Sequence, residues 1–478
     1  MILALIAQVA AATPNLLLIS VDGLRADRVG AYGMMPSPTP GIDRLAAEGL
    51  VCELGFSQSN ESLFSHAVLF TGLYASEIAP PDYRTFVVPD RATLLPEVLR
   101  LYGYATGGFA AGGHVKGVYG FAQGFDVYDD QYDFGAFFHT TPTALAWLEA
   151  IGDSPFFLFL HGYDTHRPYM HSGLYHHAFD ADGARTVDEL IDQAETERIF
   201  NGVYYPDFPL TYFWHAGASE RILDPGGYGR LAEWAASRPG RPITPEEQEH
   251  IRGHYDSGAL SADLQITRLV EALGKSGAWD HTLVMLVADH GEDLGEHGLY
   301  NHRSTLADSA TRVPMILAGG ALPEALRGQR IPGPCEAIDV VPTLLAAAGA
   351  VAPKGLRGRD LLSDQPPQGA VFQEGVLPMM AVRTATHRLT VQGLPLDSPL
   401  LELLVRVAPL SAPIFALYDT RTDPGEQRDV LAEQPEVAWA LREQLLTWLT
   451  ERLPWSGVRE RPVDDPHLQE TLRSRGYW

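Results

Sequence analysis

The length, composition and charge of the chain indicate a large globular protein. Its 478 residues are 45% hydrophobic and 20% charged, and the formal net charge is −25 at pH 7. A chain of this length can bury a large core and form one big domain with a smaller one. The strong negative charge excludes nucleic acid and anionic membrane surfaces as main partners, because both require basic patches. A small anionic substrate is compatible with it, since a bound cation can reverse the local field.

The N-terminus predicts export. Residues 1–12 form an apolar run that ends in Val-Ala-Ala-Ala, which is typical of a secretory signal peptide with a small-residue cleavage site. A first buried strand or a misassigned start codon is the alternative. The run is too short to span a bilayer, so we expect no integral membrane segment in the mature chain. The predicted location is periplasmic or secreted.

The two cysteines, Cys52 and Cys335, leave their pairing open. Two are too few for a disulfide scaffold, and they lack the spacing of a metal site. They could form one bridge or remain buried thiols.

Three apolar runs predict buried strands that end in Asp and His. These runs are residues 15–22, 154–166 and 281–290. They lack alternation, as expected for strands buried on both faces of a parallel sheet, and helical patterns separate them. The chain therefore predicts a doubly wound α/β fold with a mostly parallel sheet. Because sites in such sheets form at the carboxyl ends of the strands, the polar residues at these ends are expected to converge.

The remaining segments predict an insertion and a smaller subdomain. Residues 167–250 are polar and rich in Tyr, Trp, His and Gly, which is typical of an excursion that shapes a substrate pocket. An ordinary packed surface subdomain fits the same pattern. Residues 369–478 have the pattern of short strands followed by a helix. We therefore expect a catalytic domain over residues 13–368 and a C-terminal α+β subdomain over residues 369–478.

The segment SNESLFSHAVLFTG, residues 59–72, places four hydroxyl groups and a histidine around the start of an apolar run. Such residues commonly begin a helix, with Asn60 or Ser62 as the N-cap. A second interpretation is that one of the hydroxyl groups is a nucleophile.

Asp22, Asp289 and His290 could together bind a divalent metal ion, and a hydroxyl group could supply a further ligand. A metal ion beside Ser62 would favour its alkoxide, and the N-terminus of the helix would help to hold an attached anion. This combination suits nucleophilic attack on a sulfate or phosphate ester.

Several motifs resemble those of the sulfatase family within the alkaline phosphatase superfamily. NLLLISVDGLRADRVGAYG resembles the opening strand with its metal-ligand Asp, and SLFSHAVLFTGLYASE resembles the nucleophile helix. FLFLHGYDTHRPY resembles the strand that carries a substrate-contacting His, and DHTLVMLVADHGEDLGEHGLYNHRSTLADSATRVPMIL resembles the second metal motif. The resemblance covers nearly the whole chain in the expected order and implies an alkaline-phosphatase-like fold.

The resemblance implies a nucleophile and a ligand set. The family's nucleophile precedes the Thr of a Thr-Gly pair by nine residues; here that Thr is Thr71 and the nucleophile is Ser62. Ser65 is then a structural hydroxyl in the first turn of the helix. The implied metal ligands are Asp22, Ser62, Asp289 and His290.

The resemblance also implies residues that contact the substrate. His166 matches the position that contacts the oxygens of the ester. His302, with His297 as a near alternative, matches a Lys or His that protonates the leaving group or binds the anion. The Gly-Lys pair expected after residues 103–106 is absent, so Lys116 or His114 is the candidate for its role.

The chain departs from the family pattern at the metal ligands and at the nucleophile. Gly23 stands where sulfatases have a second Asp, and Asp289-His290 replaces Asp-Asn. The imidazole favours Zn or Mn over Ca, although Ca is possible. Residues 62–66 lack the Pro and Arg of the Cys/Ser-x-Pro-x-Arg signature, which argues against conversion of Ser62 to formylglycine.

We therefore predict a metal-dependent hydrolase of sulfate or phosphate esters with an unmodified serine nucleophile and a small anionic ester as substrate. One alternative is a phospho-group transferase or phosphodiesterase that acts on an envelope lipid or glycan. Another is a non-catalytic binding protein that kept the fold. A second metal ion, as in alkaline-phosphatase-like enzymes, would need Asp164, His166 and His161.

Overall fold

A computed structural model describes most of the chain. The described residues are 13–79, 86–167, 169, 178–179, 243–300, 302–363, 369–376, 379–392 and 401–451. The predicted signal peptide, most of the predicted insertion and the end of the predicted subdomain lie outside them. In the part that is described, no helix is both long and apolar enough to cross a membrane.

The central sheet has eight strands in the order β4-β3-β5-β1-β6-β7-β2-β8. The strands are β1 (Asn15–Val21), β2 (Leu50–Phe56), β3 (Ala105–Phe109), β4 (Val127–Asp129), β5 (Phe156–Gly162), β6 (Thr282–Val287), β7 (Met315–Ala318) and β8 (Gln329–Glu336). Neighbouring strands are parallel except where β7 runs antiparallel to β6 and β2. This mostly parallel sheet confirms the predicted α/β fold.

The three predicted strands lie side by side at the centre of this sheet. β1 is hydrogen-bonded to β5 on one side and to β6 on the other, with Leu18 opposite Phe159 and Met285. Every residue of β5 and β6 is buried. This explains the apolar runs without alternation, because both faces of each strand are covered by helices.

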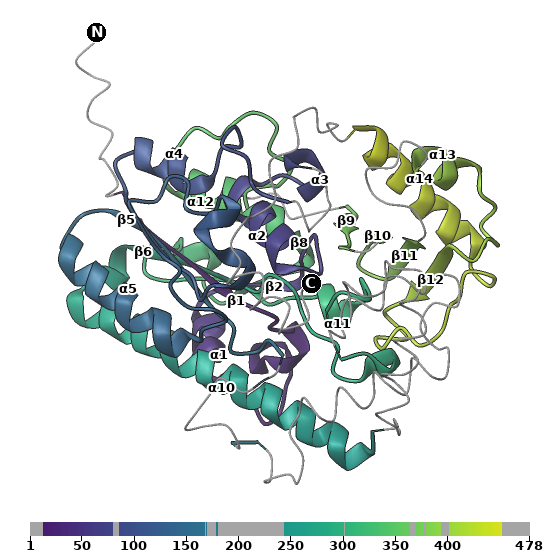
Figure 1. Ribbon diagram of the computed structural model, residues 1–478, viewed down its shortest axis with the longest axis horizontal. Helices are drawn as coiled ribbons and strands as arrows, with labels where there is room; N and C mark the ends of the chain where they lie inside the picture. The colour runs from purple at the N-terminus through teal and green to yellow at the C-terminus, as the bar shows by residue number, and fades with distance from the viewer. Residues whose placement is uncertain are drawn as a thin grey trace, which may run out of the picture.

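Helices cover both faces of the sheet (Figure 1). On one face lie α1 (Pro40–Glu48), α5 (Phe137–Ile151) and α10 (Pro245–Ser276), and on the other lie α2 (Ser62–Thr71), α4 (Leu95–Leu101) and α12 (Val340–Ala347). Two shorter helices are α3 (Ala75–Ile78) and α11 (Asp308–Thr311). Among the helices of the described residues, α10 is the longest. It begins with a capping box between Thr244 and Glu247, and its C-cap is Gly277 in the left-handed conformation.

A second, smaller sheet lies beside the first (Figure 1). It is antiparallel, with the order β12-β11-β10-β9. Its strands are β9 (Val371–Glu374), β10 (Met379–Arg383), β11 (His387–Gln392) and β12 (Phe415–Asp419), and they are accompanied by α13 (Leu401–Val407) and α14 (Pro435–Glu451). The sheet lies within the predicted C-terminal α+β subdomain. The exact domain boundaries stay a prediction.

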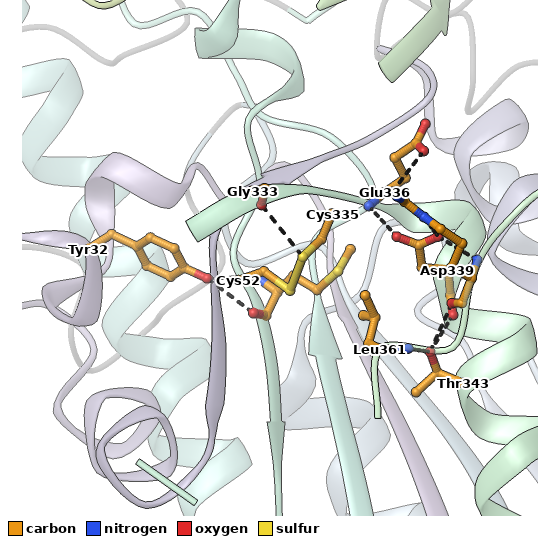
Figure 2. The surroundings of a disulfide bond; sticks show 10 residues. Tyr32, Cys52, Gly333, Cys335, Glu336, Asp339, Thr343 and Leu361 are labelled. Carbon is orange, nitrogen blue, oxygen red and sulfur yellow. Dashed lines mark hydrogen bonds and ion pairs between the residues drawn. A yellow bond between two sulfur atoms is a disulfide. The ribbon is translucent and has the colours of Figure 1, made fainter. Parts of the chain in front are cut away.

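The two cysteines form a disulfide bond (Figure 2). Cys52 lies on β2 and Cys335 on the adjacent parallel strand β8, with their Cα atoms 6.1 Å apart. Both residues are fully buried. The bond therefore connects two core strands that are separated by 283 residues in the sequence.

The disulfide is expected to stabilise the fold by constraining the unfolded chain. We expect the Cys52→Ala/Cys335→Ala variant to lose about 2–5 kcal/mol of unfolding free energy, as measured by urea denaturation under oxidising conditions. Reductant should destabilise the wild type and leave this variant unchanged, because the chain has no other cysteine. Equal stability of oxidised wild type and variant would contradict the prediction.

Candidate active site

Polar residues gather at the carboxyl ends of the central strands, as predicted. Asp22 follows β1, His161 lies near the end of β5, and Asp289 and His290 follow β6. All four side chains are fully buried. Because β5, β1 and β6 are adjacent and parallel, these ends share one edge of the sheet.

Ser62 is the first residue of α2, and its side chain faces this edge. Its Oγ donates a hydrogen bond to Asp22 Oδ2 at 3.0 Å and lies 3.1 Å from His290 Nε2. The interpretation of Asn60 or Ser62 as the N-cap is wrong: the N-cap is Glu61, and its side chain accepts no capping hydrogen bond. The positive end of the α2 dipole therefore points at the Ser62 hydroxyl and at any anion bound there.

Ser65, the other candidate hydroxyl, faces elsewhere. It donates to the backbone carbonyl of Ser59 and contacts Ser57 Oγ at 3.1 Å. These contacts tie α2 to the loop that precedes it. Geometry thus gives Ser62, and not Ser65, access to the carboxylates.

Asp22, Asp289 and His290 lie close enough to share a cation. One ligand atom from each residue lies within 4.8 Å of the others. Asp22 Oδ1 and Asp289 Oδ2 are buried and accept no hydrogen bond from an N–H or hydroxyl donor of the described residues. Burial and the nearby Asp289 carboxylate raise the pKa of Asp22 well above its usual range. Such crowded, undersatisfied carboxylates fit a divalent cation between them.

The tautomer of His290 supports the same conclusion. His290 Nδ1 donates to the Gly291 carbonyl at 2.8 Å, and burial lowers the pKa of the imidazole, so Nε2 carries a lone pair. This lone pair and the Asp22 carboxylate both point at the single proton of Ser62. The hydroxyl can satisfy only one of them, whereas a cation would satisfy both.

Two further histidines lie next to the carboxylates of the cluster. His161 Nδ1 accepts from the Ala111 amide, and its Nε2 lies 3.5 Å from Asp22 Oδ2. His66 Nδ1 donates to the Ser62 carbonyl at 2.8 Å and lies 3.6 Å from Asp289 Oδ2. Burial lowers the pKa of both imidazoles, so they are neutral and add no positive charge.

A second group of possible ligands consists of His166, Glu292 and His302. Their ligand atoms also lie within 4.8 Å of one another, and all three residues are buried. Burial opposes a charge on His302, but Glu292 and Glu61 raise its pKa to about 9. Glu292 is not among the residues predicted from the sequence, although it follows Asp289 by only three residues in the same loop.

The second site suggested from the sequence is not formed. Asp164 accepts hydrogen bonds from the Phe137 amide and the Ser261 hydroxyl, so its carboxyl group connects the first residue of α5 to α10. Burial raises its pKa to about 7. Of the suggested set, only His166 joins a group of possible ligands, and its partners are Glu292 and His302.

Two predicted substrate contacts have other partners. Lys116 forms an ion pair with Asp133, and His297 bonds to the Glu426 carbonyl at 2.9 Å. Neither side chain is thereby directed at the cluster. His114, the alternative to Lys116, is buried and bonds to Glu61, the neighbour of Ser62.

Glu61, which is also not among the residues predicted from the sequence, links His114 to the cluster. It accepts hydrogen bonds from His114 Nδ1 at 2.6 Å and Arg303 Nε at 2.5 Å, and it lies 3.6 Å from His302 Nε2. Burial alone would raise the pKa of Glu61, but Arg303 and His114 hold it well below its usual range. Its position next to Ser62 was the available signal in the sequence.

A mostly parallel α/β sheet with an Asp, His and Ser cluster at its carboxyl edge has the architecture of the alkaline phosphatase superfamily. Among solved structures, the phosphonate monoester hydrolase of Agrobacterium radiobacter aligns with a TM-score of 0.67 at 20% identity, covering 92% of this chain and 96% of that one. A glucosamine-2-N,6-O-disulfate complex of the protein BT4656 aligns with a TM-score of 0.65 at 19% identity, covering 92% and 99%. These similarities show the fold.

The sulfatase family model matches residues 14–350, and the chain belongs to this family. It is 24% identical over 454 residues to the uncharacterized sulfatase YidJ of Escherichia coli, covering 87% of this chain and 83% of that protein. It is 27% identical over 415 residues to the multifunctional alkaline phosphatase superfamily protein PehA of Trinickia caryophylli, covering 73% and 76%. The chain is therefore an ester hydrolase for sulfate or phosphate esters.

The buried ion pair between Glu61 and Arg303 is expected to matter for stability. Glu61→Gln would remove the carboxylate that pairs with the buried guanidinium of Arg303, so we expect a loss of about 3–5 kcal/mol in unfolding free energy. The matched control is Glu271→Gln, which breaks the exposed pair with Lys275 and should cost less than about 1 kcal/mol. Urea denaturation of both variants tests this, and equal effects would contradict it.

Proposed function

We propose that the chain hydrolyses its ester by in-line attack of Ser62 Oγ, with a divalent cation held by Asp22, Ser62, Asp289 and His290. The observation that supports this most directly is the Ser62 hydroxyl, 3.0 Å from Asp22 Oδ2 and 3.1 Å from His290 Nε2. The cation would lower the pKa of the hydroxyl and neutralise developing negative charge.

The described residues have separate roles in this proposal. Ser62 gives its proton to water, its oxygen bonds to the sulfur or phosphorus atom, and the bond to the leaving oxygen, which takes up a proton from water, breaks on the opposite side. Water then displaces the group from Ser62. The α2 N-terminus stabilises the charged oxygens, and His166 and His302 bind them from the side of the β5 and β6 loops.

Within the two ester classes, we favour a phosphorus ester. Ser62 lacks the Pro and Arg of the formylglycine signature, and an unmodified serine releases phosphate more readily than sulfate. The similarity to a phosphonate monoester hydrolase is compatible with this choice. The imidazole of His290 favours Zn or Mn in the site, with Ca as the less suitable ion.

We also propose that the protein acts in the periplasm or outside the cell. The buried Cys52–Cys335 disulfide supports this, because such bonds persist mainly in oxidising compartments. The predicted signal peptide over residues 1–12 points to the same location.

Removal of the nucleophile is the main test. We expect Ser62→Ala to lower kcat/KM by at least about a thousand-fold on p-nitrophenyl phosphate monoester, phosphate diester and sulfate alike. Ser65→Ala, three residues along the same helix, should stay within about ten-fold of the wild type. Full turnover by Ser62→Ala on all three esters would show that another group attacks. A preference for sulfate would instead require formylglycine at residue 62.

Metal removal tests the proposed ligands. Dialysis against a chelator should abolish hydrolysis, and Zn or Mn should restore it better than Ca. Asp289→Asn should lower kcat/KM at least about a hundred-fold at fixed metal concentration. Asp164→Asn is the matched control, because this equally buried carboxyl group bonds to α5 and α10 and should keep most of the activity. Full activity of the metal-depleted protein would overturn the assignment.

A further inference from the structure

We propose that Glu426, beside the smaller sheet, and His297, in the loop between β6 and α11, are positioning residues for hydrolysis. Their contact holds this loop, residues 288–307, in the course that brings His302 to the cluster. Both residues act through the loop and need no contact with the ester. The proposal rests on the proposed function only for the role of His302.

The loop between β6 and α11 carries residues of the candidate active site in both of its halves. Asp289 and His290 follow β6 directly, and His302 and Arg303 lie in the second half. The His302 ring stacks on the His290 ring, with centroids 4.2 Å apart. A long connection keeps such a course only where packed elements hold it, because its own backbone contacts are few.

His297 has a left-handed backbone conformation with φ 53°. Residues with a Cβ rarely adopt it, since the Cβ then crowds the following carbonyl, whereas glycine adopts it freely. The residue lies in a turn that is closed by a hydrogen bond from the Gly295 amide to the Leu299 carbonyl at 2.7 Å. The His297 side chain uses this position: its Nε2 donates to the Glu426 carbonyl at 2.9 Å. Strain of this kind persists where surrounding contacts impose it, and it is frequent at functional sites.

Glu426, the acceptor of this bond, is also left-handed, with φ 51°. It lies in the turn after β12, and it is buried. Its carboxylate accepts from Arg388 Nε at 2.5 Å and from the Asp308 amide at 2.8 Å. Asp308 is the first residue of α11, where the loop ends. One buried residue therefore contacts the middle of the loop through its carbonyl and the end of the loop through its carboxylate.

Two arginines of the smaller sheet fix Glu426 and Asp308. Arg383 on β10 and Arg388 on β11 are directly opposite each other in the antiparallel pair, and both are buried. Like charges at such positions destabilise a sheet unless each is compensated. Arg383 bonds to both carboxylate oxygens of Asp308 at 2.9 Å, and Arg388 pairs with Glu426. These two ion pairs give the end of the loop a defined orientation relative to the smaller sheet.

The first half of the loop is held from the central sheet. Arg25, in the loop after β1, donates to the Glu292 carbonyl at 2.9 Å and to Glu296 Oε1 at 3.0 Å. His302 lies between the two points that Glu426 contacts. Without the His297 contact this second half would be fixed only at Asp308, and a displacement of about 1 Å at a catalytic group can cost about a hundred-fold in rate.

Replacement of His297 by glycine separates positioning from stability. Because His297 is exposed and glycine suits the left-handed backbone, His297→Gly should keep the wild-type midpoint in urea. We expect its kcat on the p-nitrophenyl esters to fall at least about ten-fold with KM within about three-fold. Hydrogen–deuterium exchange of peptides from residues 288–307 of the full-length protein should become faster. His297→Gln, whose amide N–H can donate to the same carbonyl, should restore kcat and slow exchange.

Glu426→Gln tests the other partner and should shift kcat and loop exchange in the same direction, because it weakens the pair with Arg388. Glu402→Gln is the control, since it removes an exposed ion pair with Arg406 on α13 and should behave as the wild type in every readout. Wild-type kcat in His297→Gly would overturn the proposal. A lower kcat with unchanged exchange of the loop would overturn it too. The His297 variants decide the question even if Glu426→Gln fails to fold.

The outcome is separable from that of the proposed function. If Ser62→Ala keeps full turnover, the proposed nucleophile is wrong, whereas the effects of His297→Gly on kcat and on exchange still decide the positioning role. If hydrolysis requires Ser62 and His297→Gly matches the wild type, the proposed function stands and the positioning role is refuted.

Discussion

Buried negative charge is the constraint on which the site depends. Asp22 and Asp289 are fully buried, and the neighbouring imidazoles are neutral because burial lowers their pKa values. An ionised carboxylate in such surroundings costs several kcal/mol unless a cation or several hydrogen bonds compensate it. Here two of the carboxylate oxygens lack donors among the described residues. A bound cation would resolve this imbalance, which is the physical basis of the proposed metal centre.

The topology of the sheet brings these carboxylates together. β1 and β6 are parallel neighbours, so the residues that follow them must meet at one edge. α2 then brings its N-terminus to the same edge, with Ser62 as its first residue. The Ser62 hydroxyl thus meets the carboxylates at the end of a helix dipole that favours anions. The scaffold, and not a flexible loop, sets these positions.

The departures from the sulfatase pattern are concentrated at this edge. Compared with the family pattern, Gly23 stands in place of one carboxylate and His290 in place of an amide. These changes remove two oxygen ligands and add one imidazole. Since imidazole binds Zn or Mn well, this change of donor set favours these ions over Ca in the proposed site.

The sequence by itself determined the class of fold and the residues at the strand ends. Apolar runs without alternation reveal strands buried on both faces, so Asp22 and Asp289 could be placed from local periodicity alone. The family pattern then pointed to Ser62. Only the tertiary structure decided which side chains meet across the loops: Glu61 contacts Arg303 over 242 positions, and the pairing of the cysteines was equally open. Local hydrophobic patterns fix where a strand ends, whereas the partner of a buried charge depends on how distant loops pack, which no local pattern records.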